Sequence, residues 1–276
     1  MALRLHEFAR RIAALSDIEE IVTAMRSLAF VELRRLIETI AHQSETTAAR
    51  ERAIGQLLAH YPQPLSVAGT GSDVLLAIGS ERGFCGDFNT TLAALLQARQ
   101  DGANRLLVVG ARLALLLEDA GVAHEALGGA TVSDEVPRVL QNIAAALGAD
   151  LANRARTSGL VVLHHDSDGA LAPVRLLPSP SGVPPARHTR LQLQLPPREL
   201  FERLMDQYLI GRLNAALLAS LHAENRRRLE HTGAAIDRLD RELDIVQRQR
   251  RRARYEAITE EIEIMLLGAP DGPHAA

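Results

Sequence analysis

Residues 197–267 read PRELFERLMDQYLIGRLNAALLASLHAENRRRLEHTGAAIDRLDRELDIVQRQRRRARYEAITEEIEIMLL, and this stretch decides the fold. It has no proline after Pro197, and its glycines, Gly211 and Gly233, are isolated. Because proline removes a helical hydrogen bond and clashes with the preceding turn, its absence permits one uninterrupted helix. Pro197 suits a helix start, and Gly268 with Pro270 suits a stop. Such a helix would be about 100 Å long, so it needs a partner helix, a partner protein, or both.

Apolar and small side chains along this stretch repeat at coiled-coil spacing. The predicted seam consists of Leu229, Thr232, Ile236, Leu239, Leu243, Val246, Arg250, Ala253, Ala257 and Ile264. Steps of three and four residues give a narrow stripe, which is typical of a coiled coil rather than of a helix buried in a core.

The first sixty residues predict a second long helix. Its apolar stripe consists of Phe8, Ile12, Leu15, Ile18, Val22, Met25, Leu28, Leu33, Leu36, Ile37 and Ile40. Gly55 and the segment 61–64, which reads YPQP, are expected to end it. Two such helices at opposite ends of the chain predict an antiparallel two-helix coiled coil. This shaft would comprise residues 1–60 and 198–276, with residues 61–197 inserted as a globular head.

The head has the pattern of an α/β domain. Short apolar runs at 73–80, 105–111 and 159–165 predict buried strands, and helices are expected between them at 89–99, 112–120 and 133–156. Ser133 could cap the last of these helices. Residues 173–177 and 189–195 would add a final pair of strands. Strands that alternate with helices predict a mostly parallel, doubly wound sheet covered on both faces.

Composition excludes several classes of function. The chain contains no lysine, so neither a Walker-type phosphate loop nor a Schiff-base enzyme is possible. Its one cysteine, Cys85, excludes an intramolecular disulfide and a cysteine-based zinc site. Basic and acidic residues balance along 198–267, which argues against a nucleic-acid partner. No charge-free apolar run reaches about eighteen residues, so the chain is expected to be soluble.

The head nevertheless contains candidate sites. Residues 79–89 (GSERGFCGDFN) follow a predicted strand and precede a helix, the usual place for a phosphate-binding turn, although the spacing matches neither known glycine fingerprint. The alternative is a structural turn. Cys85 could act as a nucleophile if a histidine such as His124 converged on it. A metal site could be built from His164, His165, Asp166 and Asp168.

Arginines cluster near the end of the long C-terminal helix. They are Arg248, Arg250, Arg251, Arg252 and Arg254. One interpretation is a solvated helix face, and the other is a collar that meets acidic loops of a partner protein.

Three motifs resemble one known family. Residues 21–25 (IVTAM), with Leu28 and the arginines at 34–35, resemble the N-terminal helix motif of the gamma subunit of F-type ATP synthases. Residues 81–89 (ERGFCGDFN) are similar to that family's Asp-Arg-Gly-Leu-Cys-Gly-Gly-Phe-Asn turn, and residues 252–262 (RARYEAITEEI) to its C-terminal signature. The motifs occur in the family's order, and the resemblance covers essentially the whole chain.

The resemblance implies a rotor without catalytic residues. Such a central-stalk subunit transmits torque between an ion-driven membrane ring and the catalytic hexamer, and so couples proton or other ion transport to ATP synthesis or hydrolysis. The implied partners are the alpha and beta subunits, the epsilon subunit and the membrane c-ring. No cofactor, metal ion, nucleic acid or direct membrane insertion is expected. The implied location is peripheral, at the cytoplasmic face of a bacterial inner membrane.

The resemblance also implies roles for individual residues. Those matching contacts with the beta catch loops and the upper bearing are Arg254, Tyr255, Thr259, Glu261, Ile262, Met265 and Leu266. Those matching a charged collar are Arg26, Arg228, Arg250, Arg251 and Arg252. Those of the structural turn are Arg82, Gly83, Cys85, Gly86 and Asn89.

The chain also departs from the family. Tyr255 stands where glutamine is usual, and Asp17, Glu19 and Glu20 stand where basic and amide residues are common. We interpret this as a divergent member that belongs to an alternate synthase. The competing hypothesis is an α/β enzyme that dimerises through its coiled coil and uses the 79–89 turn as its site.

Overall fold

A computed structural model describes residues 2–61, 72–99, 105–152, 157–177 and 192–267. The chain divides into two compact units. One combines Met1–Leu28 with Glu230–Ala276, and the other is Ala29–Leu229.

Two long helices enclose an α/β segment in sequence. The elements are α1 (Ala2–His60), β1 (Ser72–Ile78), α2 (Phe88–Ala98), β2 (Arg105–Val109), α3 (Ala111–Asp119), β3 (Glu125–Leu127), the 3-10 turn η1 (Ser133–Glu135), α4 (Val136–Ala152), β4 (Thr157–His165), β5 (Leu171–Leu177) and α5 (Pro197–Leu267). The long helices and the α/β fold class predicted from the sequence are therefore confirmed.

The Ala29–Leu229 unit is built on a five-stranded sheet in the order β3-β2-β1-β4-β5. The first four strands are parallel, and β5 runs antiparallel to β4. Leu76 of the central strand β1 lies between Leu107 of β2 and Val162 of β4. The sheet is thus mostly parallel, as its buried apolar strands predict.

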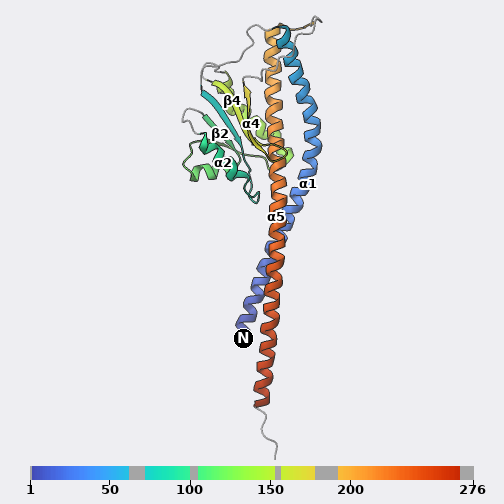
Figure 1. Ribbon diagram of the computed structural model, residues 1–276, viewed down its shortest axis with the longest axis vertical. Coiled ribbons are helices and arrows are strands. Elements are labelled where there is room, and N and C mark those ends of the chain that lie inside the picture. Colours follow the sequence, from blue (N-terminus) through green and yellow to red (C-terminus); the bar gives the residue numbers. More distant parts are fainter. Residues whose placement is uncertain (1, 62–71, 100–104, 153–156, 178–191, 268–276) are drawn as a thin grey trace, which may run out of the picture. The chain divides into compact units, whose positions relative to one another are not determined.

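Helices cover both faces of this sheet (Figure 1). Helices α2 and α3 pack on one face, where Ala77 is buried. Helix α4 and the parts of α1 and α5 in this unit pack on the other, where Leu76 is buried. Consecutive residues of β1 thus enter opposite cores, because side chains alternate across a strand.

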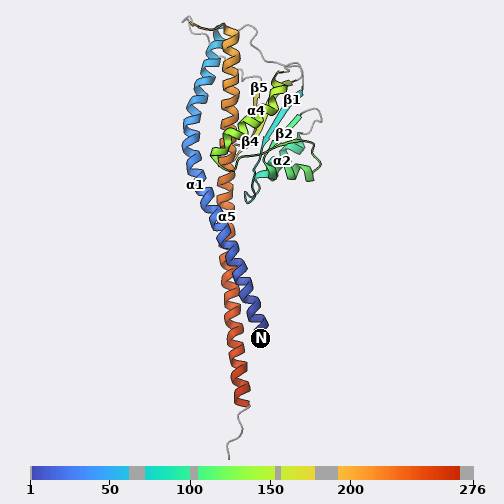
Figure 2. The same ribbon diagram turned by 180° about the vertical axis from the view of Figure 1, so that it is seen from behind.

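Within each unit, the α1 segment lies beside the α5 segment in both views (Figures 1 and 2). In the first unit Arg11 forms an ion pair with Glu242 at 3.8 Å. In the second unit Glu51 pairs with Arg212 at 3.4 Å. Higher residue numbers on α1 meet lower numbers on α5, so the helices are antiparallel, as predicted.

The seam on α1 differs from the prediction. Ile18 and Leu28 are 47% and 67% exposed, and Ile37 is also exposed, whereas Val22, Ala29 and Leu36 are buried. These three buried positions lie seven residues apart. The predicted stripe was too wide because the α-helix has 3.6 residues per turn, whereas a coiled-coil seam repeats every 3.5 residues. Over a long helix, residues on one helical face therefore drift away from the seam.

The seam on α5 ends earlier than predicted. Val246 and Ala253 are buried, but Arg250 is exposed and Ile264 is 64% exposed. Helix α1 begins at Ala2, a few turns before the Arg11–Glu242 pair, so it provides no surface for the last turns of α5.

Other local predictions were wrong. Residues 192–195 form no strand, whereas 189–191 lie outside the described residues. The short strand β3 was missed.

Ser133 begins η1 rather than capping α4, and its backbone N–H donates to Glu32 Oε1 at 2.6 Å. Gly55 does not end α1, which continues to His60. The predicted helix stops at 62–64 and 268–270 also lie outside the described residues. The domain boundaries at 60/61 and 197/198 stay a prediction.

Helix α3 offers a matched test of the core. Leu113 is fully buried beneath the sheet, whereas Leu115 on the same helix is 50% exposed. We expect Leu113→Ala to lower the free energy of unfolding by about 2–5 kcal/mol, because it removes buried methyl groups and leaves a cavity. Leu115→Ala should change it by about 0.5 kcal/mol or less. Urea unfolding followed by circular dichroism would measure both, and equal losses would contradict the assigned faces of α3.

Candidate functional site

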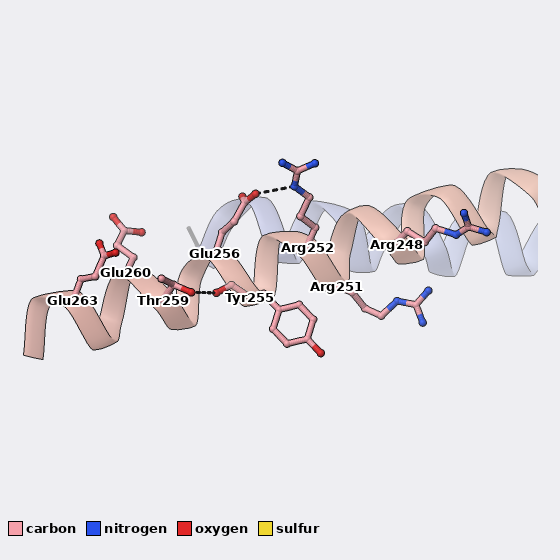
Figure 3. A pocket seen from close by; sticks show the side chains of 8 residues that line it. All are labelled: Arg248, Arg251, Arg252, Tyr255, Glu256, Thr259, Glu260 and Glu263. Atoms are coloured by element: carbon pink, nitrogen blue, oxygen red, sulfur yellow. Dashed lines mark hydrogen bonds and ion pairs between the residues drawn. The ribbon is translucent and has the colours of Figure 1, made fainter.

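The last turns of α5 present a surface that no described part of the chain covers. Every side chain from Ile258 to Leu267 is exposed. Overlapping this segment, the helix surface carries a shallow depression of about 660 Å³, lined by Arg248, Arg251, Arg252, Tyr255, Glu256, Thr259, Glu260 and Glu263. Figure 3 shows these side chains along the helix, with the arginines in one part and the glutamates in the other.

Some of these charges are paired along the helix. Arg248 bonds to Asp244, and Arg252 Nε donates to Glu256 Oε1 at 3.0 Å (Figure 3). Both pairs are largely exposed. Exposed pairs at this spacing contribute about 0.3–0.5 kcal/mol each, so a stronger external partner can displace them.

Other arginines of the cluster have no intramolecular partner in the described part of the chain, so their charges are available to a partner protein. In the described part of the chain, no hydrogen bond or ion pair involves the exposed Arg250, Arg251 or Arg254. Arg26 of the predicted collar is also exposed and lies near Gly233, whose added Cβ would be 3.9 Å from the guanidinium carbon.

The residues predicted to meet beta loops and a bearing lie on this end of α5. Tyr255 is 71% exposed and Leu266 is 72% exposed; Ile262 and Met265 are exposed as well. Thr259 Oγ1 donates to the Tyr255 carbonyl at 3.0 Å (Figure 3). Arg254 and Glu261 are exposed too. Their proposed contacts with other subunits stay a prediction.

The 79–89 turn forms a second cluster, at the carboxyl end of β1. Asn89 accepts the Ser80 backbone N–H at 3.0 Å and donates to Ser80 Oγ at 2.7 Å. Ser80 Oγ donates to the Arg82 carbonyl at 2.8 Å, and Cys85 Sγ lies 3.4 Å from the same hydroxyl. Gly86 has a positive φ of 61°, a conformation that glycine adopts without strain.

The turn is also fixed to neighbouring loops. Glu81 Oε2 accepts the backbone N–H groups of Ala111 at 3.0 Å and Gly129 at 2.8 Å. Gly110 has φ 105°, and a Cβ there would lie 2.7 Å from the carbonyl oxygens of Gly79 and Ser80. Three loops at the sheet edge therefore approach closely, which leaves their geometry little freedom.

Arg228 lies in this cluster rather than on an exposed collar. It is 6% exposed, and its guanidinium donates to the Gly83 carbonyl at 3.3 Å, to Asn225 Oδ1 at 3.1 Å and to Glu224 Oε1. This internal pairing does not fit the predicted role of Arg228 in contacting another subunit. The sequence reasoning missed Glu224, although the i,i+4 spacing to Arg228 was a readable signal.

Burial dominates the electrostatics of both acidic groups here. Desolvation raises the pKa of Glu224 to about 7, even though the Arg228 guanidinium lowers it. Burial likewise raises the pKa of the Cys85 thiol, against the lowering effect of its contact with Ser80.

The histidines do not form the catalytic or metal arrangements considered above. His165 Nε2 lies 3.0 Å from the Phe88 carbonyl, and its ring stacks on Phe88 at 4.2 Å between centroids. His164 Nδ1 contacts the His165 carbonyl, and His124 Nδ1 the Val122 carbonyl. Among the described residues no group of three or more His, Cys, Asp or Glu side chains could hold a metal ion.

Comparison with known proteins decides the family. A family model described as ATP synthase matches residues 4–269. The chain belongs to the gamma-chain family of ATP synthases. The ATP synthase gamma chain of Frankia casuarinae is 27% identical over 98% of both chains. That of Ruegeria pomeroyi is 35% identical, but over 41% of this chain and 40% of the relative.

Solved structures share the fold. The rotor of the Euglena gracilis mitochondrial ATP synthase has a TM-score of 0.62 at 12% identity, and the match covers 94% of this chain and all of that one. A second Euglena structure, of an OSCP/F1/c-ring assembly, has a TM-score of 0.58 at 14% identity and covers 100% of this chain and 99% of that one. Membership of the gamma family makes the chain a central-stalk subunit of an ATP synthase, as its motifs predicted. No described helix is long and apolar enough to cross a bilayer.

The burial of Cys85 predicts an unreactive thiol. We expect the native chain to react with a maleimide at least about a hundredfold more slowly than the unfolded chain, because the thiolate is the nucleophile and the site disfavours it. A Ser44→Cys variant, which places a thiol on an exposed face of α1, is the control and should be labelled once, rapidly. Mass spectrometry would count the labels. Rapid labelling of Cys85 in the folded chain would contradict its burial.

The raised pKa of Glu224 predicts a pH-dependent stability. A carboxyl whose pKa is higher in the folded state stabilises the fold when protonated, and this contribution is lost as pH rises from about 4.5 through about 7. We expect the free energy of unfolding of the wild type to fall with a slope of the order of 1 kcal/mol per pH unit in this window. Glu224→Gln should remove this slope. Urea unfolding at several pH values would measure the slope. Glu118→Gln, at an exposed position of α3, is the control, and parallel curves for wild type and Glu224→Gln would rule out the assignment.

Proposed function

We propose that this chain is the rotating shaft of an ion-translocating ATP synthase, transmitting torque between a membrane c-ring and a catalytic hexamer of alpha and beta subunits. The observation that carries this proposal is the end of α5, where apolar and charged side chains are presented with no covering surface in the described chain. In a family of central-stalk proteins, such an end is suited to a socket formed by other subunits.

The character of that surface supports a contact that is exchanged during rotation. Exposed ion pairs contribute about 0–1 kcal/mol, so an arginine such as Arg251 can leave one acidic partner and meet the next at little energetic penalty. The apolar tip at Ile262, Met265 and Leu266 offers non-directional contacts, which do not favour one angular position strongly.

We further propose that the chain performs no catalysis on its own. The 79–89 turn, the best candidate for an enzyme site, is filled by its own side chains and by Arg228. The proposed partners also include the epsilon subunit, and the proposed location is the cytoplasmic face of a bacterial inner membrane, held there by the complex. The Euglena assembly, which comprises OSCP, F1 and a c-ring, supports these partners by analogy.

Reconstitution tests the proposal. An alpha–beta complex that lacks its gamma subunit would be combined with this chain and the remaining subunits in vesicles. ATP-driven ion pumping should appear when the chain is added, whereas the isolated chain should hydrolyse no ATP. Pumping that is independent of the chain, or ATP hydrolysis by the isolated chain, would refute the shaft function.

The arginine cluster can be tested in the same assay. Replacing Arg250, Arg251, Arg252 and Arg254 by Ala should lower pumping about 10-fold or more through weakened contacts with acidic loops, since each lost interfacial charge pair reduces binding. The circular dichroism of the chain should be unchanged. As a control, the exposed Arg198, Arg203, Arg238 and Arg241 of the same helix are replaced by Ala. Undiminished pumping by the first variant would count against the collar.

A further inference from the structure

Helix α5 holds the 79–89 turn through a buried group of polar side chains. Glu224 and Asn225 are each 2% exposed and Arg228 is 6% exposed. The Arg228 guanidinium donates to Glu224 Oε1 and Asn225 Oδ1 of α5 and to the Gly83 carbonyl of the turn. Arginine suits this role because its planar fork holds several acceptors in a fixed geometry.

The 79–89 turn is itself fixed to the sheet by hydrogen bonds. Ser80 and Asn89 bond to one another across it, and Glu81 binds the backbone at Ala111 and Gly129. A displacement of Gly83 would therefore strain the loops that follow β1, β2 and β3. The contact from Arg228 to Gly83 therefore connects α5 to the edge of the sheet where these three loops are joined by hydrogen bonds.

A second contact joins the same two segments. Arg227 Nη1 donates to Asp87 Oδ1 at 2.5 Å, on the more exposed side of the turn. Two successive arginines of α5 thus bind the turn at two points.

The position of this contact along α5 is informative. Upstream, side chains such as Tyr208, Leu217 and Leu221 pack into the apolar core, where contacts are non-directional. Arg228 lies at the end of the Ala29–Leu229 unit, just before α5 continues into the other unit. A directional contact there fixes the angular setting of the helix about its own axis, which apolar packing specifies less strictly.

Stability alone does not account for a buried pair of this kind. Desolvating both charges opposes folding, and apolar side chains of similar volume are often as stabilising or more so. What the pair adds is geometry, because charge-assisted hydrogen bonds require a particular direction.

We propose that Glu224, Asn225 and Arg228 are positioning residues that fix α5 against the 79–89 turn, so that torque passes between the α/β domain and α5 without slip. This inference rests on the proposed shaft function. Glu224 and Asn225 act through Arg228 by holding its guanidinium on the Gly83 carbonyl.

The test uses the double variant Glu224→Met/Arg228→Met in the reconstituted complex. Its free energy of unfolding should equal or exceed that of the wild type. The number of ions pumped per ATP hydrolysed should nevertheless fall about three- to thirtyfold, while ATP hydrolysis continues. A matched control, Glu51→Met/Arg212→Met, removes a Glu–Arg pair that joins α5 to α1 in the same unit and should leave the ratio unchanged.

A second variant covers the case in which the double variant does not fold. Arg228→Lys keeps the charge beside Glu224 but cannot bridge three acceptors, so it should lower the pumping ratio and speed amide hydrogen exchange in residues 82–89. A normal ratio in either folded variant overturns the proposal. If the wild-type chain itself fails to restore pumping, it is the shaft function that fails, and the two results are thus distinguishable.

Discussion

The burial of α5 against the sheet is the contact on which the rest of the structure depends. Between residues 201 and 221 this helix contributes buried side chains around much of its circumference, including Phe201, Tyr208 and Leu217, to the core shared with β1, β4 and α4. Further along, burial narrows to the seam of Val246 and Ala253, and at Ile258 it stops. One helix is thus a core element, a coiled-coil strand and an exposed end in succession.

The amino-acid composition of α5 differs among these three environments, and this difference explains why each part of the helix packs as it does. Where the helix enters a core, large apolar residues occur at most positions. Where it meets one neighbouring helix, apolar and small residues are confined to a seam, and charged residues such as Arg248 and Asp244 pair along the exposed face. The uncovered end carries both apolar and charged side chains, a combination typical of a surface that contacts other proteins.

The sequence was sufficient for the long helices, their antiparallel pairing and the parallel sheet, because proline placement and apolar periodicity are local signals. It was insufficient where the outcome depends on distant packing. Ile18 and Leu28 have the spacing of seam residues but are exposed, since the partner helix contacts a narrower stripe that includes Val22, Ala29 and Leu36. The three-residue strand β3 is too short for a periodic signal. Arg228 reads as one of several surface arginines, and only the approach of the 79–89 turn makes it a buried group. The proposed contacts of the α5 end depend on the residues of other chains, so one sequence does not specify them.

The burial of Cys85 has a practical consequence for single-molecule experiments. Because the chain has one thiol and that thiol is buried within the turn beside Ser80 and Asn89, a fluorophore or a gold bead can be attached through an engineered cysteine at a chosen exposed position without first deleting the native one. An engineered cysteine would therefore be the one reactive attachment site for a label that reports the proposed rotation of the chain.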